Sequence, residues 1–499
     1  YNISNTLNWK DNSGNWRCNI ALQGQSRDGT ILRLRDNASG FTSGSSPKPV
    51  IMTASQNPNV PGVGGGNQAF LNNLYDLTVH TGSGNHGAIG IDYLVNNQGV
   101  LKNVRVQSGD GNGVAGVSMR REWPGPGLLK NVTVTGFQYG IQLGHSVLSM
   151  TMEDVSISGQ KTAGIYNNGN VLSIRKLTSN NTVPAIVNTG VTPWGPIADG
   201  FIVLLDSRLT GGSTANSAIR NEGHLLLRNV FTSGYKTNPL WNRGSEIAGP
   251  NYTEWCSSST QSLFSSPSRT LGLAIEETPN YWNNELTQWQ KVGPRLSGET
   301  DDTAAIQRAI DAGKPVVYFP VNRNPVVSNT VYVRGNVRQI LGMGNEIKLT
   351  GGNFSDTANP RPVIRVDRTV GTVFIERLLF GYDTGAGSIA IQHNSARDLV
   401  LKQINIFLRG MTYQNVSSGN GRLFIEDVSS HMHSANRWVF NGQNVWARQF
   451  NVEANISPQV MNNGGKFWVL GYKTEDEATL IYTANGMTEL LGGFHYNVR

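Results

Sequence analysis

The stretch Gly164-Ile-Tyr-Asn-Asn-Gly169 is a short apolar strand followed by a turn, and variants of it recur along the first half of the chain. The variants begin at Gly140, Ala185 and Ala218, so successive units start 24, 21 and 33 residues apart. Strands that repeat every 20–25 residues or so, with no helix between them, are typical of a β-solenoid, in which each coil stacks on the next. We therefore predict an all-β solenoid; a β-sandwich is the alternative that such short strands leave open.

Asparagine occupies the turn of three of these units. Equal positions of stacked coils lie above one another, so their side-chain amides can form a ladder of hydrogen bonds. The residues expected in this ladder are Asn167, Asn188 and Asn221.

A longer repeat divides the chain in two. Gly87-Ala-Ile-Gly-Ile91 resembles Gly387-Ser-Ile-Ala-Ile391, and Val100-Leu-Lys-Asn-Val-Arg-Val106 resembles Val400-Leu-Lys-Gln-Ile-Asn-Ile406, both at an offset of 300 residues. Two segments that agree at one offset, each with alternating apolar residues, indicate a tandem duplication. We predict two solenoids, which a chain of 499 residues is long enough to build.

One helix is expected, over residues 301–313 (DDTAAIQRAIDAG). Asp302 or Thr303 can begin it, Ile306 and Ile310 share one face, and a glycine can end it. The open end of a solenoid leaves unpaired apolar rungs, and an amphipathic helix protects them. We predict that this helix caps the second solenoid; metal binding by its paired aspartates is the less favoured alternative.

These patterns set the expected domains. The first solenoid covers residues 1–234, and by comparison with the second copy its cap would lie before Tyr1, so we expect that cap to be missing. Residues 235–296 interrupt the repeat, are rich in Ser, Pro, Asn and Trp, and are expected to connect the two solenoids. The second solenoid covers residues 297–499.

Composition limits the classes of function. The net charge is +7, but Lys and Arg are scattered, so we expect no nucleic-acid binding. The chain has no apolar run long enough to span a membrane. Its two cysteines, Cys18 and Cys256, are too few for a disulfide scaffold, and the sequence leaves their pairing open.

Two glutamates stand one coil apart near the end of the chain. Glu453 and Glu475 are 22 residues apart, so both carboxyl groups can face one groove. Hydrolysis of a glycosidic bond needs such a pair, one protonated to assist the leaving oxygen and one ionised to act on water. An apolar strand precedes Glu475 and favours a raised pKa, but Lys473 on the same face opposes it, so the protonation state stays open. Two solvated surface glutamates are the alternative.

The helix sequence DDTAAIQRAIDAG, followed by Val316-Val-Tyr-Phe-Pro320, resembles the pectate-lyase-like right-handed parallel β-helix superfamily. Two such parallel β-helices in tandem, together with the run from Asn444 through Glu453 to Glu475, resemble glycoside hydrolase family 55, the β-1,3-glucanases. The resemblance covers essentially the whole chain. It implies two right-handed helices side by side, with the pocket between them.

The same resemblance implies an exo-acting, inverting hydrolase of laminarin-type β-1,3-glucan. By motif, Glu475 is the general acid and Glu453 the second carboxylate. Gln142 and Tyr166 of the first helix are the best matches for residues that hold the attacking water, although the position of Tyr166 usually carries a smaller hydroxyl residue.

Weaker candidates complete the expected site. Trp446 can stack on a sugar ring through its apolar face. The spacing of His431-Met-His433 places two imidazoles on one face of a strand, where His433 can contact sugar, although metal binding or a plain surface role is open. Glu376 and Glu426 are expected at equivalent exposed positions of two coils.

Two other functions compete with hydrolysis. A polysaccharide lyase on an acidic glycan needs clustered carboxylates for Ca²⁺ and a Lys or Arg base, and we find no such cluster in the sequence. A non-catalytic glycan-binding solenoid is the other alternative, because a fold does not determine a function. We expect a secreted monomer with a polysaccharide substrate, without cofactor, metal, nucleic-acid or membrane partner.

Overall fold

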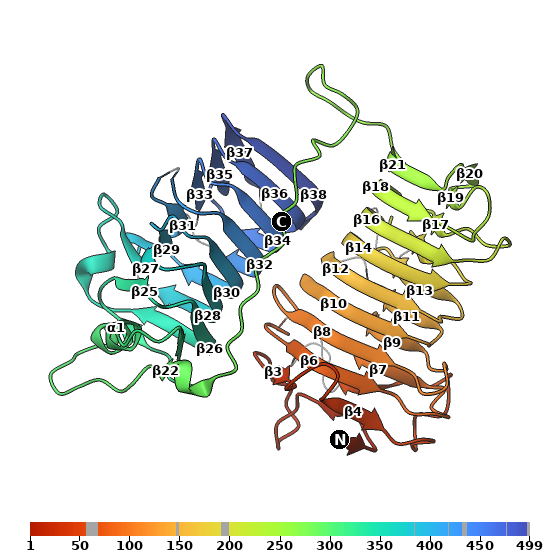
Figure 1. The fold of residues 1–499 in the computed structure, drawn as a ribbon, viewed down its shortest axis with the longest axis horizontal. Helices are drawn as coiled ribbons and strands as arrows, with labels where there is room; N and C mark the ends of the chain where they lie inside the picture. The colour runs from red at the N-terminus through yellow and green to blue at the C-terminus, as the bar shows by residue number, and fades with distance from the viewer. Residues whose placement is uncertain are drawn as a thin grey trace. The chain divides into compact units, whose positions relative to one another are not determined.

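The computed structural model describes residues 1–55, 68–145, 149–190, 199–383, 385–417, 419–431, 437–475 and 477–496. The fold is an all-β parallel solenoid, as the repeats predict, and the described residues include one α-helix (Figure 1). The chain divides into two compact units: Tyr1–Thr270 with Gly492–Phe494, and Leu271–Leu491 with His495–Arg499. Below, these are called unit 1 and unit 2, and each is described by itself.

Two sheets run along unit 1. The strands of the first long sheet are, in spatial order, β1 (Asn2–Ile3), β4 (Ile31–Leu34), β6 (Asn73–His80), β8 (Val100–Gln107), β10 (Gly127–Thr135), β12 (Ser149–Ser158), β14 (Val171–Asn181), β16 (Phe201–Gly211), β18 (His224–Thr232) and β21 (Asn251–Cys256), with β3 (Ala21–Gln23) beside β6. Those of the first short sheet are β2 (Leu7–Asn8), β5 (Lys48–Met52), β7 (Ala88–Asp92), β9 (Ala115–Met119), β11 (Tyr139–Leu143), β13 (Ala163–Asn168), β15 (Ile186–Thr189), β17 (Ile219–Asn221), β19 (Leu240–Asn242) and β20 (Ser245–Ile247).

The recurring isoleucine of the repeat explains why these coils stack. The isoleucines of β11, β13, β15 and β17 pair in parallel register and are fully buried: Ile141, Ile165, Ile186 and Ile219. Each buried side chain of this size stabilises the fold by roughly 1.5–3 kcal/mol. The period read from the sequence is therefore the period of the core.

The asparagine ladder is confirmed and is longer than predicted. The side-chain amide of Asn167 donates from Nδ2 to Oδ1 of Asn188 (2.9 Å). In the same way Asn188 donates to Asn221 (2.7 Å) and Asn221 to Asn242 (2.7 Å). Asn242 belongs to β19, which pairs with β17. The ladder thus links side-chain amides at the ends of short strands over four consecutive coils.

Strands continue into the segment that the repeat pattern suggested as a connection. β19 extends the first short sheet, and then β20 and β21 turn back and pair antiparallel with β19 and β18. Ile247 of β20 pairs with Leu240, but β20 and β21 run antiparallel to their neighbours and break the period of the repeat, which is why the sequence pattern gives no sign of them.

Two further sheets run along unit 2. The strands of the second long sheet are β22 (Trp289–Lys291), β23 (Val316–Tyr318), β26 (Gln339–Leu349), β28 (Val373–Asp383), β30 (Leu399–Leu408), β32 (Leu423–His431), β34 (Val445–Glu453), β36 (Lys466–Glu475) and β38 (Met487–Tyr496), with β24 (Val326–Val327) beside β26. Those of the second short sheet are β25 (Val331–Gly335), β27 (Arg361–Thr369), β29 (Ser388–His393), β31 (Met411–Asn415), β33 (Trp438–Asn441), β35 (Val460–Asn463) and β37 (Ile481–Ala484), and the single-turn helices are η1 (Leu286–Gln288) and η2 (Gly352–Phe354).

Five successive strands of the second long sheet, β28, β30, β32, β34 and β36, each bend at one residue with a left-handed backbone. The bend falls at equal positions of successive strands, with φ of 54° at Arg377, 48° at Gln403, 52° at Asp427, 50° at Gln449 and 74° at Gly471. An extra residue in this conformation shifts the alternation of side chains between the two faces. The outward positions before the bend and after it are therefore three residues apart instead of two.

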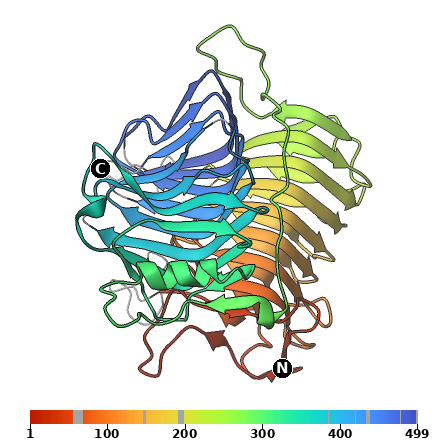
Figure 2. The ribbon, with the colours of Figure 1, turned by 60° about the vertical axis from the view of Figure 1, so that its left-hand side comes forward.

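Helix α1 (Thr303–Asp311) is the predicted helix, and it lies at one end of unit 2 (Figure 2). Ile306 and Ile310 are buried in the core of this unit, and the helix contacts β25 and β22. It covers the rungs at this end of the solenoid, as predicted.

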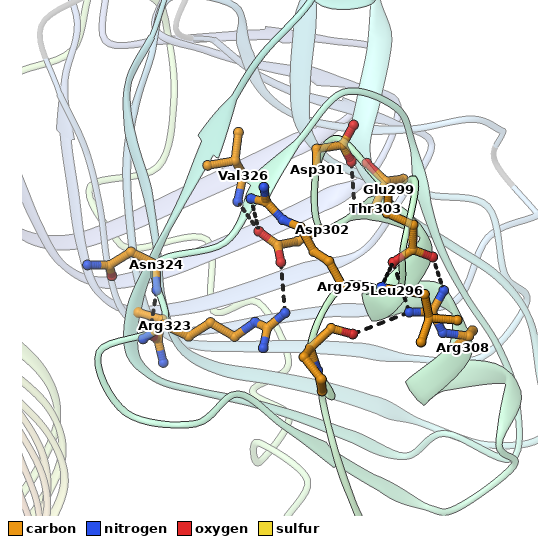
Figure 3. Close-up of polar contacts among 12 residues, drawn as sticks. Arg295, Leu296, Glu299, Asp301, Asp302, Thr303, Arg308, Arg323, Asn324 and Val326 are labelled. Carbon is orange, nitrogen blue, oxygen red and sulfur yellow. Dashed lines mark hydrogen bonds and ion pairs between the residues drawn. The ribbon is translucent and has the colours of Figure 1, made fainter.

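The paired aspartates before α1 are occupied by protein groups (Figure 3). Asp302 accepts hydrogen bonds from Arg295 Nη2 (2.8 Å), Arg323 Nη2 (2.7 Å) and the Val326 backbone N–H (2.9 Å). The N–H of Thr303 bonds to Asp301 Oδ1 at 2.8 Å. Asp302 stands at the N-cap position, but its carboxylate makes no capping bond, because it joins the helix start to the following coil instead. These partners favour the structural role over metal binding.

Residues 272–281, which we call the strap, lie along the outer face of the second long sheet. The backbone N–H of Gly272 donates to Glu489 Oε1 (2.7 Å) at one end of the strap. Further on, Trp446 Nε1 donates to the Ala274 carbonyl at 2.9 Å. The extended chain therefore crosses several strands of unit 2 and is held by both backbone and side-chain bonds.

Aromatic and cationic groups fix the other end of the strap. Tyr281 stacks on Phe374 with ring centroids 5.7 Å apart, and the Arg338 guanidinium lies 4.9 Å from the Tyr281 ring. Arg448 Nη2 donates to the Glu276 carbonyl (2.7 Å). The strap thereby removes an outward row of side chains from water.

Two simpler expectations have direct outcomes. Cys18 and Cys256 are both free and exposed, so they do not pair with each other in this structure. Among the described residues, no helix is long and apolar enough to cross a membrane.

Candidate active site

The two predicted glutamates end neighbouring strands of the second long sheet. Just beyond the backbone bend, four outward residues on neighbouring strands pair in parallel register and form a first column of side chains. They are Asn405, Ser429, Asn451 and Lys473. A second column lies two residues further on, where His431 pairs with Glu453. Glu475 follows Lys473 at the same two-residue distance and ends β36. The site is therefore a polar strip on the outer face of unit 2.

Glu453 is the most heavily bonded carboxylate of the strip. His431 Nδ1 lies 2.8 Å from Glu453 Oε2, and Asn451 Nδ2 donates to Oε1 at 2.8 Å. Lys473 Nζ also donates to Oε1. With 4% of its side chain exposed, Glu453 is removed from water and surrounded by donors.

Lys473 joins the two glutamates. Its ammonium group donates to one oxygen of Glu453 and to one oxygen of Glu475, and its side chain is fully buried. Because one nitrogen contacts both carboxyl groups, the two face the same side of the sheet, within about 6 Å of each other at their nearest oxygens. The side chain of Glu475 is 21% exposed and is the part of this pair that reaches water.

The surroundings push the two carboxyl pKa values apart. Burial alone would raise the pKa of Glu453, but the charges and hydrogen bonds of His431 and Lys473 outweigh it and hold that pKa well below its usual range. Burial, followed by the charge of Glu453, raises the pKa of Glu475, and Lys473 only partly offsets this. The sequence left the protonation of Glu475 open; in the structure its surroundings raise its pKa.

His431 is held by a second contact. Its ring stacks on Phe407 with centroids 4.4 Å apart and planes 16° from parallel. Phe407 is half-buried on the neighbouring strand β30. The stack fixes the imidazole so that Nδ1 faces Glu453.

Two predicted residues lie in unit 1. Gln142 on β11 and Tyr166 on β13 occupy paired positions of adjacent coils. Gln142 is buried, and the Tyr166 ring packs 5.4 Å from that of Tyr139. Their role in holding water stays a prediction.

The structure corrects the expectation for Trp446. Its indole is 5% exposed, stacks on Phe424 at 5.4 Å, and bonds through Nε1 to the strap at Ala274. A sugar cannot stack on it while the strap is in place. His433, the other weak candidate, lies outside the described residues.

The exposure predicted for Glu376 and Glu426 is also wrong. Glu426 is 1% exposed, and Glu376 pairs with Lys402 Nζ at 3.6 Å on the same outer face. Alternation places both residues outward, but it cannot show that residues far away in the sequence cover this face.

Sequence reasoning missed Asn451 and the part played by His431. Asn451 and Glu453 have the same two-residue spacing as Lys473 and Glu475, and this repeated pattern is the signal that would have identified Asn451. His431 was considered only for metal, sugar or surface roles. Its pairing with Glu453 depends on strand register, which the sequence does not specify beyond the coil length.

The comparisons with known proteins agree with a carbohydrate enzyme. No protein-family model matches the chain. Over 309 residues, 54% of this chain, it is 25% identical to a glucan 1,3-beta-glucosidase of Cochliobolus carbonum. The match spans 38% of that relative's length. The name of this distant relative and the solenoid fold both fit a glycoside hydrolase.

Proposed function

We propose that the chain hydrolyses β-1,3-glucan of the laminarin type, with Glu475 as general acid and Glu453 as the ionised carboxylate beside the attacking water. One observation carries the proposal. Two carboxyl groups lie one coil apart, both bonded to Lys473, and their surroundings move their pKa values in opposite directions. Such a division between acid and carboxylate is what glycoside hydrolysis requires.

Exposure supports this assignment of roles. Glu475 reaches solvent and can meet the glycosidic oxygen of a bound chain, whereas Glu453 lies deeper. In the reaction, Glu475 gives its proton to the leaving oxygen as the bond from that oxygen to the anomeric carbon breaks. A water forms the new bond to this carbon and late in the step passes a proton to the Glu453 carboxylate, which then releases it to solvent.

The strongly lowered pKa of Glu453 limits what it can do. A carboxylate that stays ionised so firmly is a weak proton acceptor until the water has begun to bond to carbon. We assign to it the orientation of this water and the stabilisation of positive charge on the sugar ring.

Exo action and inversion are the finer parts of the proposal, and they rest on the resemblance of the chain to β-1,3-glucanases. An inverting enzyme releases α-glucose first from a β-linked chain, since water attacks the face opposite the leaving group. Proton NMR of the first turnovers on laminarin distinguishes the α from the β anomer. First release of the β anomer would contradict inversion.

The test of the function combines substrates with a matched pair of variants. Laminarin is compared with pectin, pullulan and β-1,4-glucan, and Glu475→Gln is compared with Glu376→Gln, another Lys-paired glutamate of the same sheet face. We expect Glu475→Gln to lower laminarin hydrolysis by roughly 10²–10⁴-fold with binding retained, since it removes the proton donor. Glu376→Gln should keep its activity.

Each other outcome is informative. Hydrolysis unchanged in Glu475→Gln contradicts the role of this residue. Products with the ultraviolet absorbance of an unsaturated sugar indicate a lyase. Binding without turnover of any of the glycans indicates a glycan-binding solenoid. We also propose a secreted monomer; light scattering after gel filtration tests the monomeric state.

A further inference from the structure

A fully buried ammonium group on an outward strand position is unusual. Lys473 has no exposed side-chain surface, although its position on β36 points away from the core of the solenoid. Transfer of an ammonium group out of water costs several kcal/mol unless partners compensate for it. At most outward positions a lysine keeps its charge in water. Lys473 instead ends between two carboxyl groups.

The backbone beneath Lys473 is fixed from both sides. The neighbouring inward side chains Tyr472 and Thr474 each donate a hydroxyl hydrogen bond of 3.0 Å to Gln459 Oε1. Gln459 Nε2 in turn donates to the Ala454 carbonyl at 2.9 Å, next to Glu453. A shared buried amide thus ties β36 to the end of β34. These bonds hold the backbone of β36 in place, and with it the position of the Lys473 ammonium group between the two glutamates.

We propose that Lys473 is a positioning residue, whose ammonium group bridges Glu453 and Glu475 and holds both carboxyl groups in the arrangement that hydrolysis needs. This inference rests on the function proposed above and goes beyond it. A bridging cation offsets the repulsion of two neighbouring carboxylates and restricts the rotamers of both side chains. Errors of about 1 Å in such positions cost roughly 10²-fold in rate.

The bridge also has an electrostatic effect on both groups. The ammonium group lowers the pKa of Glu453 together with His431, and it moderates the rise in the pKa of Glu475. Its removal should therefore move both limbs of the pH–rate profile to higher pH. The charged and titratable groups on β32, β34, β36 and β38, besides Lys473 itself, are Glu426, Asp427, His431, Arg448, Glu453, Lys466, Tyr472, Glu475, Glu489, His495 and Tyr496.

Three variants separate positioning from simple stability. Lys473→Met keeps the length of the side chain and removes its charge, and Lys473→Arg keeps the charge. Lys402→Met removes another buried, glutamate-paired ammonium group from the same sheet. We expect Lys473→Met to lower kcat on laminarin by roughly 10²-fold with KM changed much less, and to shift both pH limbs upward.

The controls should behave differently. Lys473→Arg should keep the pH limbs at their wild-type positions, although its larger guanidinium group can lower kcat. Lys402→Met should lose stability but keep the wild-type pH profile. A folded Lys473→Met with unchanged kcat and unchanged pH limbs overturns the proposal, and so does a Lys402→Met with the same pH shifts.

A measurement that needs no activity separates this inference from the proposed function. In protein with ¹³C-labelled glutamate carboxyl groups, the Glu453 signal is assigned with Glu453→Gln and titrated by NMR. Wild-type Glu453 should titrate well below its ordinary value, and in Lys473→Met it should titrate higher. If the wild type hydrolyses none of the glycans, the proposed function fails, while this titration still decides the role of Lys473. If Lys473→Met does not fold, a Glu453 that titrates at its ordinary value in the wild type overturns the proposal.

Discussion

At the scale of single residues, two glutamates one coil apart have their pKa values moved in opposite directions. Glu453 receives two positively charged or protonatable neighbours and an amide, and stays ionised. Glu475 receives a share of one ammonium group and the repulsion of Glu453. Both glutamates stand at equivalent positions of the repeat. The difference in their pKa values therefore arises from the neighbouring side chains at the ends of the strands.

The pH dependence of hydrolysis should follow these two pKa shifts. Glu475 must be protonated, so kcat/KM should fall as pH rises through its pKa, which lies above the ordinary glutamate value of 4.5. Glu453 must be ionised, and its lowered pKa puts the acid limb below that value. Initial rates on laminarin from about pH 3 to about pH 8 test this prediction. A basic limb at or below the ordinary value would contradict it.

Glu453→Gln should destabilise unit 2 in a pH-dependent way. The folded pKa of Glu453 lies below the unfolded one, so the ionised group stabilises the fold above the unfolded pKa and loses this effect as pH falls through the folded pKa. At neutral pH the variant should lose about 3–5 kcal/mol, because its buried cationic partner keeps fewer compensating charges. Urea unfolding at neutral and acidic pH measures both values. A difference that does not shrink on acidification would contradict the prediction.

The sequence predicts the position of a residue well where its neighbours in space are also close in the chain. The 22-residue coil places Glu453 and Glu475 together, and the two-residue spacing brings Lys473 to the same side. Trp446 was placed wrongly with respect to solvent, because the strap residue that it contacts, Ala274, lies 172 residues earlier in the sequence.

At the scale of elements, the backbone bends decide which side chains enter the site. Strict alternation along β34 from Arg448 would turn Asn451 and Glu453 inward. The left-handed residue at Gln449 shifts the phase, so both point outward. No glycine marks this bend in β34, and so the sequence alone did not locate it.

The start of α1 joins the helix to the coil that follows it. Asp302→Asn should lower the stability of unit 2 by about 2–4 kcal/mol, because the buried carboxylate holds Arg323 and the Val326 backbone N–H. Asp311→Asn, at the more exposed end of α1 and paired with Arg334, is the matched control and should have little effect. Thermal unfolding of both variants makes the comparison. Equal losses would show that the Asp302 contacts are not special.

At the scale of the whole molecule, the two units are joined by a stretch without strands. No strand residue occurs between Cys256 and the 3₁₀ turn η1, and all of these residues are described. Leu263 and Phe264 are 94% and 80% exposed there. The strap begins only at residue 272, and Ser257, Ser258 and Thr270 are hydrogen-bonded to strands of unit 1, so the unsupported part is residues 259–269.

Limited proteolysis should cut this part first. Chymotrypsin should cleave after Leu263 or Phe264, because an exposed, strand-free backbone fits a protease site. Cleavage within residues 272–281 should be slow, since the strap is bound along its length. Mass spectrometry of the earliest fragments identifies the site. First cleavage inside the strap would contradict its bound state.

The strap also sets an order of events during synthesis. Gly272 and its partner Glu489 are 217 residues apart in the chain, and Ala274 and Trp446 are 172 apart. At roughly 5–20 residues per second, the ribosome needs about 10–40 s to make the chain between Gly272 and Glu489. Until then the strap can contact only the strands already made, and its bond to Glu489 is missing. The last coil to be made therefore completes a binding surface for a segment that was finished much earlier, so closure of the strap belongs to the end of folding.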